Sequence, residues 1–399
     1  MDKLFLELIQ VAIGTRESLS RVPSAEEWKE IFATSVNQKL VAVALVGVQK
    51  LMDGEHSTIT GSLPTMLRMK WLGYAAKIAQ CNKEVTASCL ALCKQYNQDG
   101  FDCCVLKGQG NLEYYPKYLQ VFRTPGDIDV WCRKRLGIND NPLKDGNFSE
   151  VIEYVNLQWL AAGKKEHEPS YLHIDAPEIN GIPVEVHLRP SFMNNPFRNK
   201  KLQRWFNDNR NWVVTGRQGI HIPSLSFNII FQLSHIQKHL FDEGIGLRQL
   251  MDYYMVLQAY SHETGPIGNA YIESILEQLH MQKLTGAMMW SLAQAFEDIP
   301  LSGNEHDWRE KWPWMLCKPD KKEGEFLLSE ILLAGDFGKS DPRLEELNDK
   351  PKTTRYQMKR AWRRFKRNLH FLSSYPSETL CEPFTRLYHL FWRKFELWK

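Results

Sequence analysis

The chain has 399 residues, too many for one ordinary hydrophobic core, so we expect two or three domains. Hydrophobic residues make up 43% of the chain and charged residues 24%, which excludes global disorder. The formal net charge of +3 favours neither a nucleic-acid-binding protein nor an acidic tail protein, although residues 351–399 carry 12 Lys/Arg against 3 Glu and are strongly basic.

The eight cysteines form no CxxC pair and have no regular spacing, so they do not indicate a disulfide framework. Free thiols are typical of a reducing compartment. The first residues lack the basic-then-apolar layout of a signal peptide. The longest strongly apolar run, residues 40–48, is about half the length of a membrane span. We therefore expect a cytoplasmic protein without a transmembrane segment.

The chain begins with a helical pattern over residues 1–99. Ser24 and Glu27 have the spacing of a capping box that opens a helix. Pro64 suits the first turn of a long helix in which apolar residues recur at spacings of three and four. Asp99-Gly100 then interrupts the period, which predicts the end of the N-terminal helical region.

Residues 100–215 show mixed signals, because short strand-like runs alternate with helix-like stretches such as residues 148–162. Asn180-Gly181 lies between the last two strand-like runs and predicts a hairpin turn. From residue 216 to 399 the pattern is helical again. The predicted fold class is therefore α+β, with a small mixed sheet at residues 100–215 flanked by two helical regions, the second ending in a basic aromatic tail.

The sequence Asp127-Ile-Asp129 follows a Pro-Gly turn signal and begins a strand-like alternation. Side chains two apart on a strand lie on the same face, so both carboxylates should project together. Two carboxylates this close repel each other unless a cation neutralises them, and Mg²⁺ prefers oxygen ligands. The alternative is a pair of solvated carboxylates at the start of a strand.

A second polar face is predicted on the strand Pro183 to Leu188, where Glu185 and His187 alternate with apolar residues. Glu185 would supply a third carboxylate for a metal site, and His187 would ligate, shuttle a proton or orient Glu185. A solvated strand face explains the same pattern.

The run from Val105 to Gly110 takes an apolar strand into a Gly-containing turn. Glycine at such a junction lets backbone N–H groups approach an anion, and Lys107 adds positive charge for a phosphate. The spacing matches neither the dinucleotide fingerprint nor the Walker motif, so the turn by itself is a weak signal.

In this order, the three motifs resemble the nucleotidyltransferase superfamily typified by DNA polymerase beta. More closely, the sequence resembles a bacterial group of largely uncharacterised nucleotidyltransferase-like proteins. Their pattern has an LKG turn, a tyrosine-rich helix, R-x-x-G-D-I-D, a strand histidine, V-E-x-H, a helix with H-x-x-x-H, and L-R-x-x-x-D. The matching positions are Lys107 and Gly108, Glu113 to Pro116, Arg123 to Asp129, His173, Glu185 and His187, His235 and His239, and Leu247, Arg248 and Asp252. The DID and LKG elements also resemble those of nucleotidyltransferase toxins of abortive-infection type systems.

The resemblance implies a polymerase-beta-like enzyme that moves a nucleoside monophosphate from an NTP such as ATP to an acceptor hydroxyl. It implies two Mg²⁺ ions, with Mn²⁺ as an alternative, held by the catalytic residues Asp127, Asp129 and Glu185. The implied nucleotide-binding residues are Lys107, Gly108, Gln109, Gly110 and Arg123. The glycine-serine pair of the superfamily is absent, so Gln109 or Asn111 would have to replace the serine.

The later matching positions have simpler explanations as well. His235 and His239 are four apart on a predicted helix, without the glutamate of a zinc-protease motif, and either pack in the core or face the site. Arg248 and Asp252 have the spacing of an ion pair within one helix. The resemblance makes these four residues, together with His173 and His187, accessory site candidates.

Residues 355–367 contain seven Lys/Arg and no acid, with aromatic residues interleaved. This pattern fits a pair of amphipathic helices whose aromatic residues join the core while the Lys and Arg side chains stay solvated. It also fits binding to RNA, to an anionic membrane surface or to another polyanion. The acceptor of an active enzyme would be RNA, a protein or a small molecule. The alternative function is a catalytically weak scaffold, or an RNA- or partner-binding module that uses the basic C-terminus.

Overall fold

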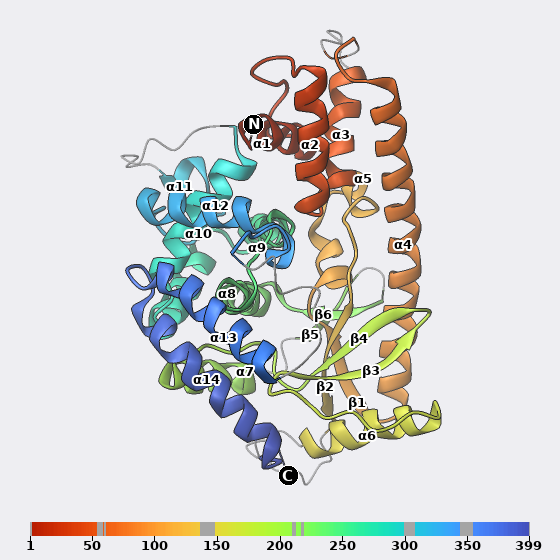
Figure 1. Ribbon diagram of the computed structural model, residues 1–399, viewed down its shortest axis with the longest axis vertical. Helices are drawn as coiled ribbons and strands as arrows, with labels where there is room; N and C mark the ends of the chain where they lie inside the picture. The colour runs from red at the N-terminus through yellow and green to blue at the C-terminus, as the bar shows by residue number, and fades with distance from the viewer. Residues whose placement is uncertain are drawn as a thin grey trace. The chain divides into compact units, whose positions relative to one another are not determined.

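The computed structural model of the chain describes residues 2–53, 59, 61–135, 148–209, 213–216, 219–298, 308–343 and 354–398. The fold is α+β, as predicted, with a small mixed sheet and many helices (Figure 1). The chain clusters into two compact units. The helical unit comprises residues 1–81, 114–124 and 239–374, and the sheet unit comprises residues 82–113, 125–238 and 375–399. The domain boundaries near residues 99 and 215 stay a prediction.

In the described residues, the helical unit contains the elements named next, two of which, α4 and α8, extend into the other unit. They are α1 (Asp2–Ile13), α2 (Ala25–Asn37), α3 (Val41–Asp53), the first half of α4 (Thr65–Gln98), α5 (Lys117–Gln120), the end of α8 (Leu225–Asp242), α9 (Leu247–Gln278), α10 (Gln282–Phe296), α11 (Trp308–Lys311), α12 (Lys321–Ala334) with η2 (Asp336–Gly338), and α13 (Thr354–Asn368) with η4 (Leu369–Phe371). α1 packs against α3 and α10, and α10 packs against α12. The buried apolar residues of these four helices form this core.

The predicted start of α2 is confirmed, because Ser24 and Glu27 form both hydrogen bonds of a capping box. The long helix after Pro64 is confirmed as α4. Trp71 of α4 is fully buried and meets Trp28 of α2 edge to face, with ring centroids 6.4 Å apart.

The sheet unit contains the second half of α4 and the remaining strands and helices. They are β1 (Phe101–Val105), η1 (Gly108–Tyr114), β2 (Ile128–Lys134), α6 (Phe148–Ala161), β3 (His173–Ile179), β4 (Ile182–His187), α7 (Pro196–Asp208), β5 (Val213–Thr215), β6 (His221–Pro223), most of α8 and α14 (Pro376–Lys394). The strand order of the main sheet is β1-β2-β4-β3, in which only β2 and β4 run parallel. The predicted hairpin is confirmed, since Asn180 and Gly181 both have positive φ between β3 and β4.

The main sheet has one apolar and one polar face. On the apolar face α6 packs against β2 and β3 (Figure 1). Phe101 of β1 contacts Tyr154 of α6 there, at a centroid distance of 4.4 Å. The second half of α4 reaches the same face, where Cys103 Sγ donates to the Cys93 carbonyl. On the polar face Trp131 stacks on Phe227 of α8. The alternation along each strand therefore places the site residues on the face opposite α6.

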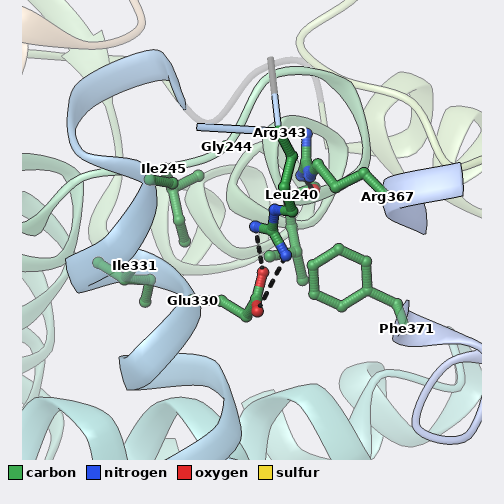
Figure 2. A pocket seen from close by; sticks show the side chains of 9 residues that line it. Leu240, Gly244, Ile245, Glu330, Ile331, Arg343, Arg367 and Phe371 are labelled. Carbon is green, nitrogen blue, oxygen red and sulfur yellow. Dashed lines mark hydrogen bonds and ion pairs between the residues drawn. The ribbon is translucent and has the colours of Figure 1, made fainter. Parts of the chain in front are cut away.

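The basic segment forms α13, but its cations differ in environment. Arg360 and Lys366 are exposed, and Trp362 is 57% exposed. Arg367 is buried and donates to the Leu240 carbonyl. Figure 2 shows its side chain beside Phe371, in a small hollow where Arg343 forms an ion pair with Glu330. The expectation that all these cations are solvated is wrong for Arg367, because it satisfies the end of α8.

The last helix, α14, also differs from the expectation that the aromatic residues of the C-terminal helices join the core. Its buried residues include the polar Glu378, Thr379 and Glu382, whereas Phe384 is 73% exposed. The Glu378 carboxylate accepts from the backbone N–H groups of Asn194 and Asn195. Most aromatic residues of α14 therefore do not join the core. In the part of the chain that the structure describes, no helix is both long and apolar enough to cross a bilayer.

Candidate active site

Three carboxylates converge on the polar face of the sheet. Asp129 of β2 lies directly opposite Glu185 in the parallel pairing of β2 with β4. Asp127 precedes β2 by one residue, and one carboxylate oxygen from each of the three residues lies within 4.8 Å of the others. Asp127 is exposed, Asp129 is 3% exposed and the side chain of Glu185 is 29% exposed. The local alternation and the parallel register together bring carboxylates from two separate parts of the chain, residues 127–129 and residue 185, to one point.

Two cationic groups contact Asp129, one from a residue earlier in the chain and one from a residue later in the chain. Lys107 Nζ lies 2.8 Å from Asp129 Oδ1, and His187 Nε2 lies 2.9 Å from the same oxygen. Burial alone would raise the pKa of Asp129, but Lys107 and His187 outweigh it and hold that pKa well below its ordinary value. Asp129 is therefore an ionised carboxylate that is already neutralised within the protein.

The pKa values of the other charged groups in the cluster also depend on burial and on the neighbouring charges. Burial alone would lower the pKa of Lys107, but Asp129, Asp127 and Glu185 raise it above its ordinary value. Burial would also lower the pKa of His187, but its hydrogen bond to Asp129 and the nearby Glu185 carboxylate raise it. The pKa of Glu185 is lowered, since His187 and His173 together outweigh burial and the charge of Asp129. The cluster therefore combines three carboxylates with two adjacent cations.

The turn after β1 holds Lys107 at this cluster. Leu106 N donates to the Asp129 carbonyl at 2.9 Å, which aligns the end of β1 with the start of β2. Gly108 has φ +59, a left-handed conformation that glycine adopts without strain. A Cβ on Gly110 would lie 2.5 Å from the Val105 carbonyl oxygen, so the turn needs a glycine there too. The backbone conformation that places Lys107 at the cluster therefore requires both glycines.

Gln109 and Asn111 point into the protein. Gln109 Nε2 donates to Asn82 Oδ1 of α4 at 3.0 Å, and Asn111 Oδ1 accepts from Asn228 Nδ2 of α8 at 3.1 Å. Both side chains are nearly fully buried. Their amides fix η1 between two helices, and a role at the nucleotide stays a prediction for both.

The two helix histidines belong to different units. His235 lies in the sheet unit, where its Nε2 is 3.1 Å from Lys107 Nζ. Because an ammonium group only donates, the imidazole accepts through Nε2. His239 is buried and belongs to the helical unit. The structure therefore brings His235 to the lysine of the turn.

Arg123, Arg248 and Asp252 belong to the helical unit. Arg123 Nε and Nη2 donate to the two carboxylate oxygens of Asp252 at 2.7 and 2.6 Å, and the Tyr115 hydroxyl donates to the same carboxylate at 2.6 Å. Arg248 contacts Asp336 at 3.3 Å. A role for Arg123 at a phosphate stays a prediction, and in this structure its guanidinium is buried against Asp252.

Strand β3 adds the predicted accessory residue His173 and a further residue, Asp175, that the sequence motifs did not indicate. His173 lies opposite His187 in the pairing of β3 with β4, and Asp175 lies opposite Glu185. One ligand atom each of His173, Glu185 and His187 lies within 4.8 Å of the others. The H-x-D spacing of His173 and Asp175 was the available signal, because it repeats the same-face alternation of Asp127 and Asp129.

Comparison with known protein families relates the chain to a nucleotidyltransferase family. The profile of a protein family described as uncharacterised nucleotidyltransferase matches residues 24–297, which include all the residues of the cluster described above. A search of curated proteins found no match, and a search of solved structures found none either.

Proposed function

The chain belongs to the family described as uncharacterised nucleotidyltransferase, and from that membership we propose that it is a metal-dependent enzyme. It would transfer the nucleoside monophosphate of an NTP, ATP among the candidates, to an acceptor hydroxyl. The observation that supports this most directly is the convergence of Asp127, Asp129 and Glu185 on adjacent parallel strands.

The residues present fit a divalent ion. The three residues offer one carboxylate oxygen each, within 4.8 Å of one another. Oxygen is the ligand atom that Mg²⁺ and Mn²⁺ prefer. Asp127, Asp129 and Glu185 would hold the ions. When bound, such ions lower the pKa of an attacking hydroxyl and offset negative charge on the triphosphate.

The chain's own groups would position and neutralise the triphosphate. Lys107 supplies a positive charge beside the carboxylates, and His235 supports its ammonium group from the other side. The glycine turn keeps the backbone at Gly108 free of a side chain, so a phosphate can approach closely. The transfer itself needs orientation and charge stabilisation more than covalent chemistry from the protein.

The experiment is a thermal unfolding assay with each of the four NTPs, with Mg²⁺ or with a chelator. A ligand at 100 times its Kd stabilises a fold by about 2.7 kcal/mol, so a bound NTP should raise Tm measurably. We expect stabilisation only when an NTP and Mg²⁺ are both present. Stabilisation that is equal with the chelator would contradict metal-dependent binding.

Asp127→Asn is the matched variant for this assay. Asp127 is exposed and precedes β2, so its replacement should leave the fold intact while removing one carboxylate from the group. We expect this variant to lose the stabilisation by Mg²⁺ and NTP. If it binds them as the wild type does, the nucleotide site lies elsewhere.

A second candidate function rests on α13. Its exposed residues include Lys359, Arg360 and Lys366, and the ring of Trp362 lies among them, with Lys366 Nζ 5.7 Å from its centroid. Exposed cations around an exposed aromatic ring favour a single-stranded polyanion such as RNA, whose bases stack on aromatic side chains. The chain would then bind RNA as an acceptor, or as a partner of a weakly catalytic scaffold.

A further inference from the structure

A second set of metal ligands lies on the polar face of the sheet, next to the three carboxylates. It consists of His173 on β3 with Glu185 and His187 on β4. We infer that these three residues bind a divalent metal ion of the class that accepts imidazole nitrogen, such as Zn²⁺ or Co²⁺. This site would share Glu185 with the proposed Mg²⁺ site and would not depend on nucleotide.

Two of the three distances between ligand atoms of the set are close to those around a tetrahedral metal ion. Glu185 Oε2 lies 3.3 Å from His173 Nδ1 and 3.6 Å from His187 Nε2. Two ligands that each lie about 2.0–2.1 Å from a tetrahedral ion are roughly 3.3–3.4 Å apart. The third pair, between the two imidazoles, lies within 4.8 Å. All three ligand atoms are therefore close enough together to surround one ion.

Each histidine has an oxygen behind the ring nitrogen that faces away from Glu185. His187 Nδ1–H donates to the Arg189 carbonyl at 3.2 Å, and His173 Nε2 lies 3.6 Å from Asp175 Oδ1. Metal-binding histidines commonly donate their second N–H to a carbonyl or carboxylate, which fixes the tautomer and the ring orientation. Since the Arg189 carbonyl fixes the Nδ1 proton of His187, Nε2 is the nitrogen directed at the carboxylates. An ion would take the place of its proton.

The nitrogen of His173 that faces Glu185 gives a second, independent indication. His173 Nδ1 is shielded from solvent, and among the residues that the structure describes it has no hydrogen-bond partner, although it lies 3.3 Å from Glu185. Buried polar atoms are normally hydrogen-bonded, so this atom needs an explanation. A metal ion between Nδ1 and the carboxylate would supply one.

An ion can reach the set from the edge of the sheet. β3 is an edge strand, and the side chains of His173 and Glu185 are 25% and 29% exposed, whereas His187 is fully buried. Two imidazoles and one carboxylate form the donor set of catalytic zinc sites that keep a fourth position open. Mg²⁺ selects oxygen, so the carboxylates of Asp127 and Asp129 and this nitrogen-containing set should select different ions.

The test is titration of the purified, nucleotide-free protein with Co²⁺, followed by visible absorption and by calorimetry. We expect wild-type protein to bind Co²⁺ with the d–d bands of a four- or five-coordinate ion. His173→Ala should abolish the bands and weaken Co²⁺ binding by at least about tenfold. His173→Gln retains side-chain bulk on β3 and should have the same effect, and it replaces the alanine variant if that protein does not fold.

Two controls define the site. His221→Ala removes an imidazole from β6 in the same unit, and Asp127→Asn removes a carboxylate from the neighbouring set only. Both should keep the Co²⁺ bands. Bands that persist in both His173 variants, or that disappear in Asp127→Asn, would overturn the inference. Because no nucleotide is present, this result is independent of the assay with Mg²⁺ and NTPs.

Discussion

Asp129→Asn should destabilise the protein, even though it removes a negative charge from a cluster of three carboxylates. In the metal-free protein Asp129 is buried and contacts both Lys107 at 2.8 Å and His187 at 2.9 Å. Its replacement removes the counter-charge closest to both cationic groups, while the carboxylates of Asp127 and Glu185 remain nearby. Removing one partner of a buried pair typically costs about 3–5 kcal/mol. The asparagine oxygen still accepts hydrogen bonds, so we expect about 3 kcal/mol, near the lower end of that range.

The matched control is Asp127→Asn. Asp127 contributes a carboxylate to the same group but is exposed, so its replacement should change the free energy of unfolding by no more than about 0.5 kcal/mol. Urea unfolding at pH 7 in the presence of a chelator measures both variants. For a unit of this size, a loss of about 3 kcal/mol also lowers Tm by roughly 6–12 °C.

The opposite outcome has a clear meaning. If Asp129→Asn is as stable as the wild type, or more stable, then repulsion among the carboxylates dominates the metal-free cluster. Lys107 and His187 would then contribute little to neutralising Asp129, and the electrostatic account of the site would be wrong.

Three further predictions concern single features of the structure. Lys107→Ala should weaken binding of Mg²⁺ with NTP but not of the nucleoside in a thermal unfolding assay, because the ammonium group faces phosphate charge. Asp252→Asn should cost about 3–5 kcal/mol at pH 7, since it leaves Arg123 buried without its partner. The pKa of Asp252 is lowered, because Arg123 outweighs burial, so this difference should shrink in urea unfolding as the pH falls below about 4. In α13, a triple charge reversal should abolish retention on RNA at low salt and leave the urea midpoint unchanged. The three exposed residues to change to Glu are Lys359, Arg360 and Lys366.

The sequence predicts the strands of the site because their signals are local. Alternation along the chain places Ile128 and Val130 in the core and Asp129 on the other face, as the structure confirms. Alternation cannot tell how deep each polar residue lies. Asp127 and Asp129 share a face, yet one is exposed and the other is buried, where it contacts Lys107 and His187.

Contacts between residues far apart in the chain are the features of the site that the sequence does not reveal. Arg248 and Asp252 have the spacing of an ion pair within one helix, but Asp252 accepts a bidentate pair of hydrogen bonds from Arg123, 129 residues earlier. Likewise, the opposition of Asp129 and Glu185 depends on the parallel register of β2 with β4, which no local pattern fixes. A shift of that register by one residue would have moved Glu185 to the apolar face.

The missing glycine-serine pair has a structural counterpart in the way η1 is held. Gln109 donates to Asn82 on α4, Asn111 accepts from Asn228 on α8, and Lys107 contacts His235 on α8. These three contacts hold every second residue of the turn, at positions 107, 109 and 111. The polar side chains of the turn therefore fix its backbone. A phosphate at this turn would therefore meet Lys107 and backbone N–H groups instead of a hydroxyl. The affinity for a triphosphate should then depend on Lys107 more strongly than in a site where a serine shares that role.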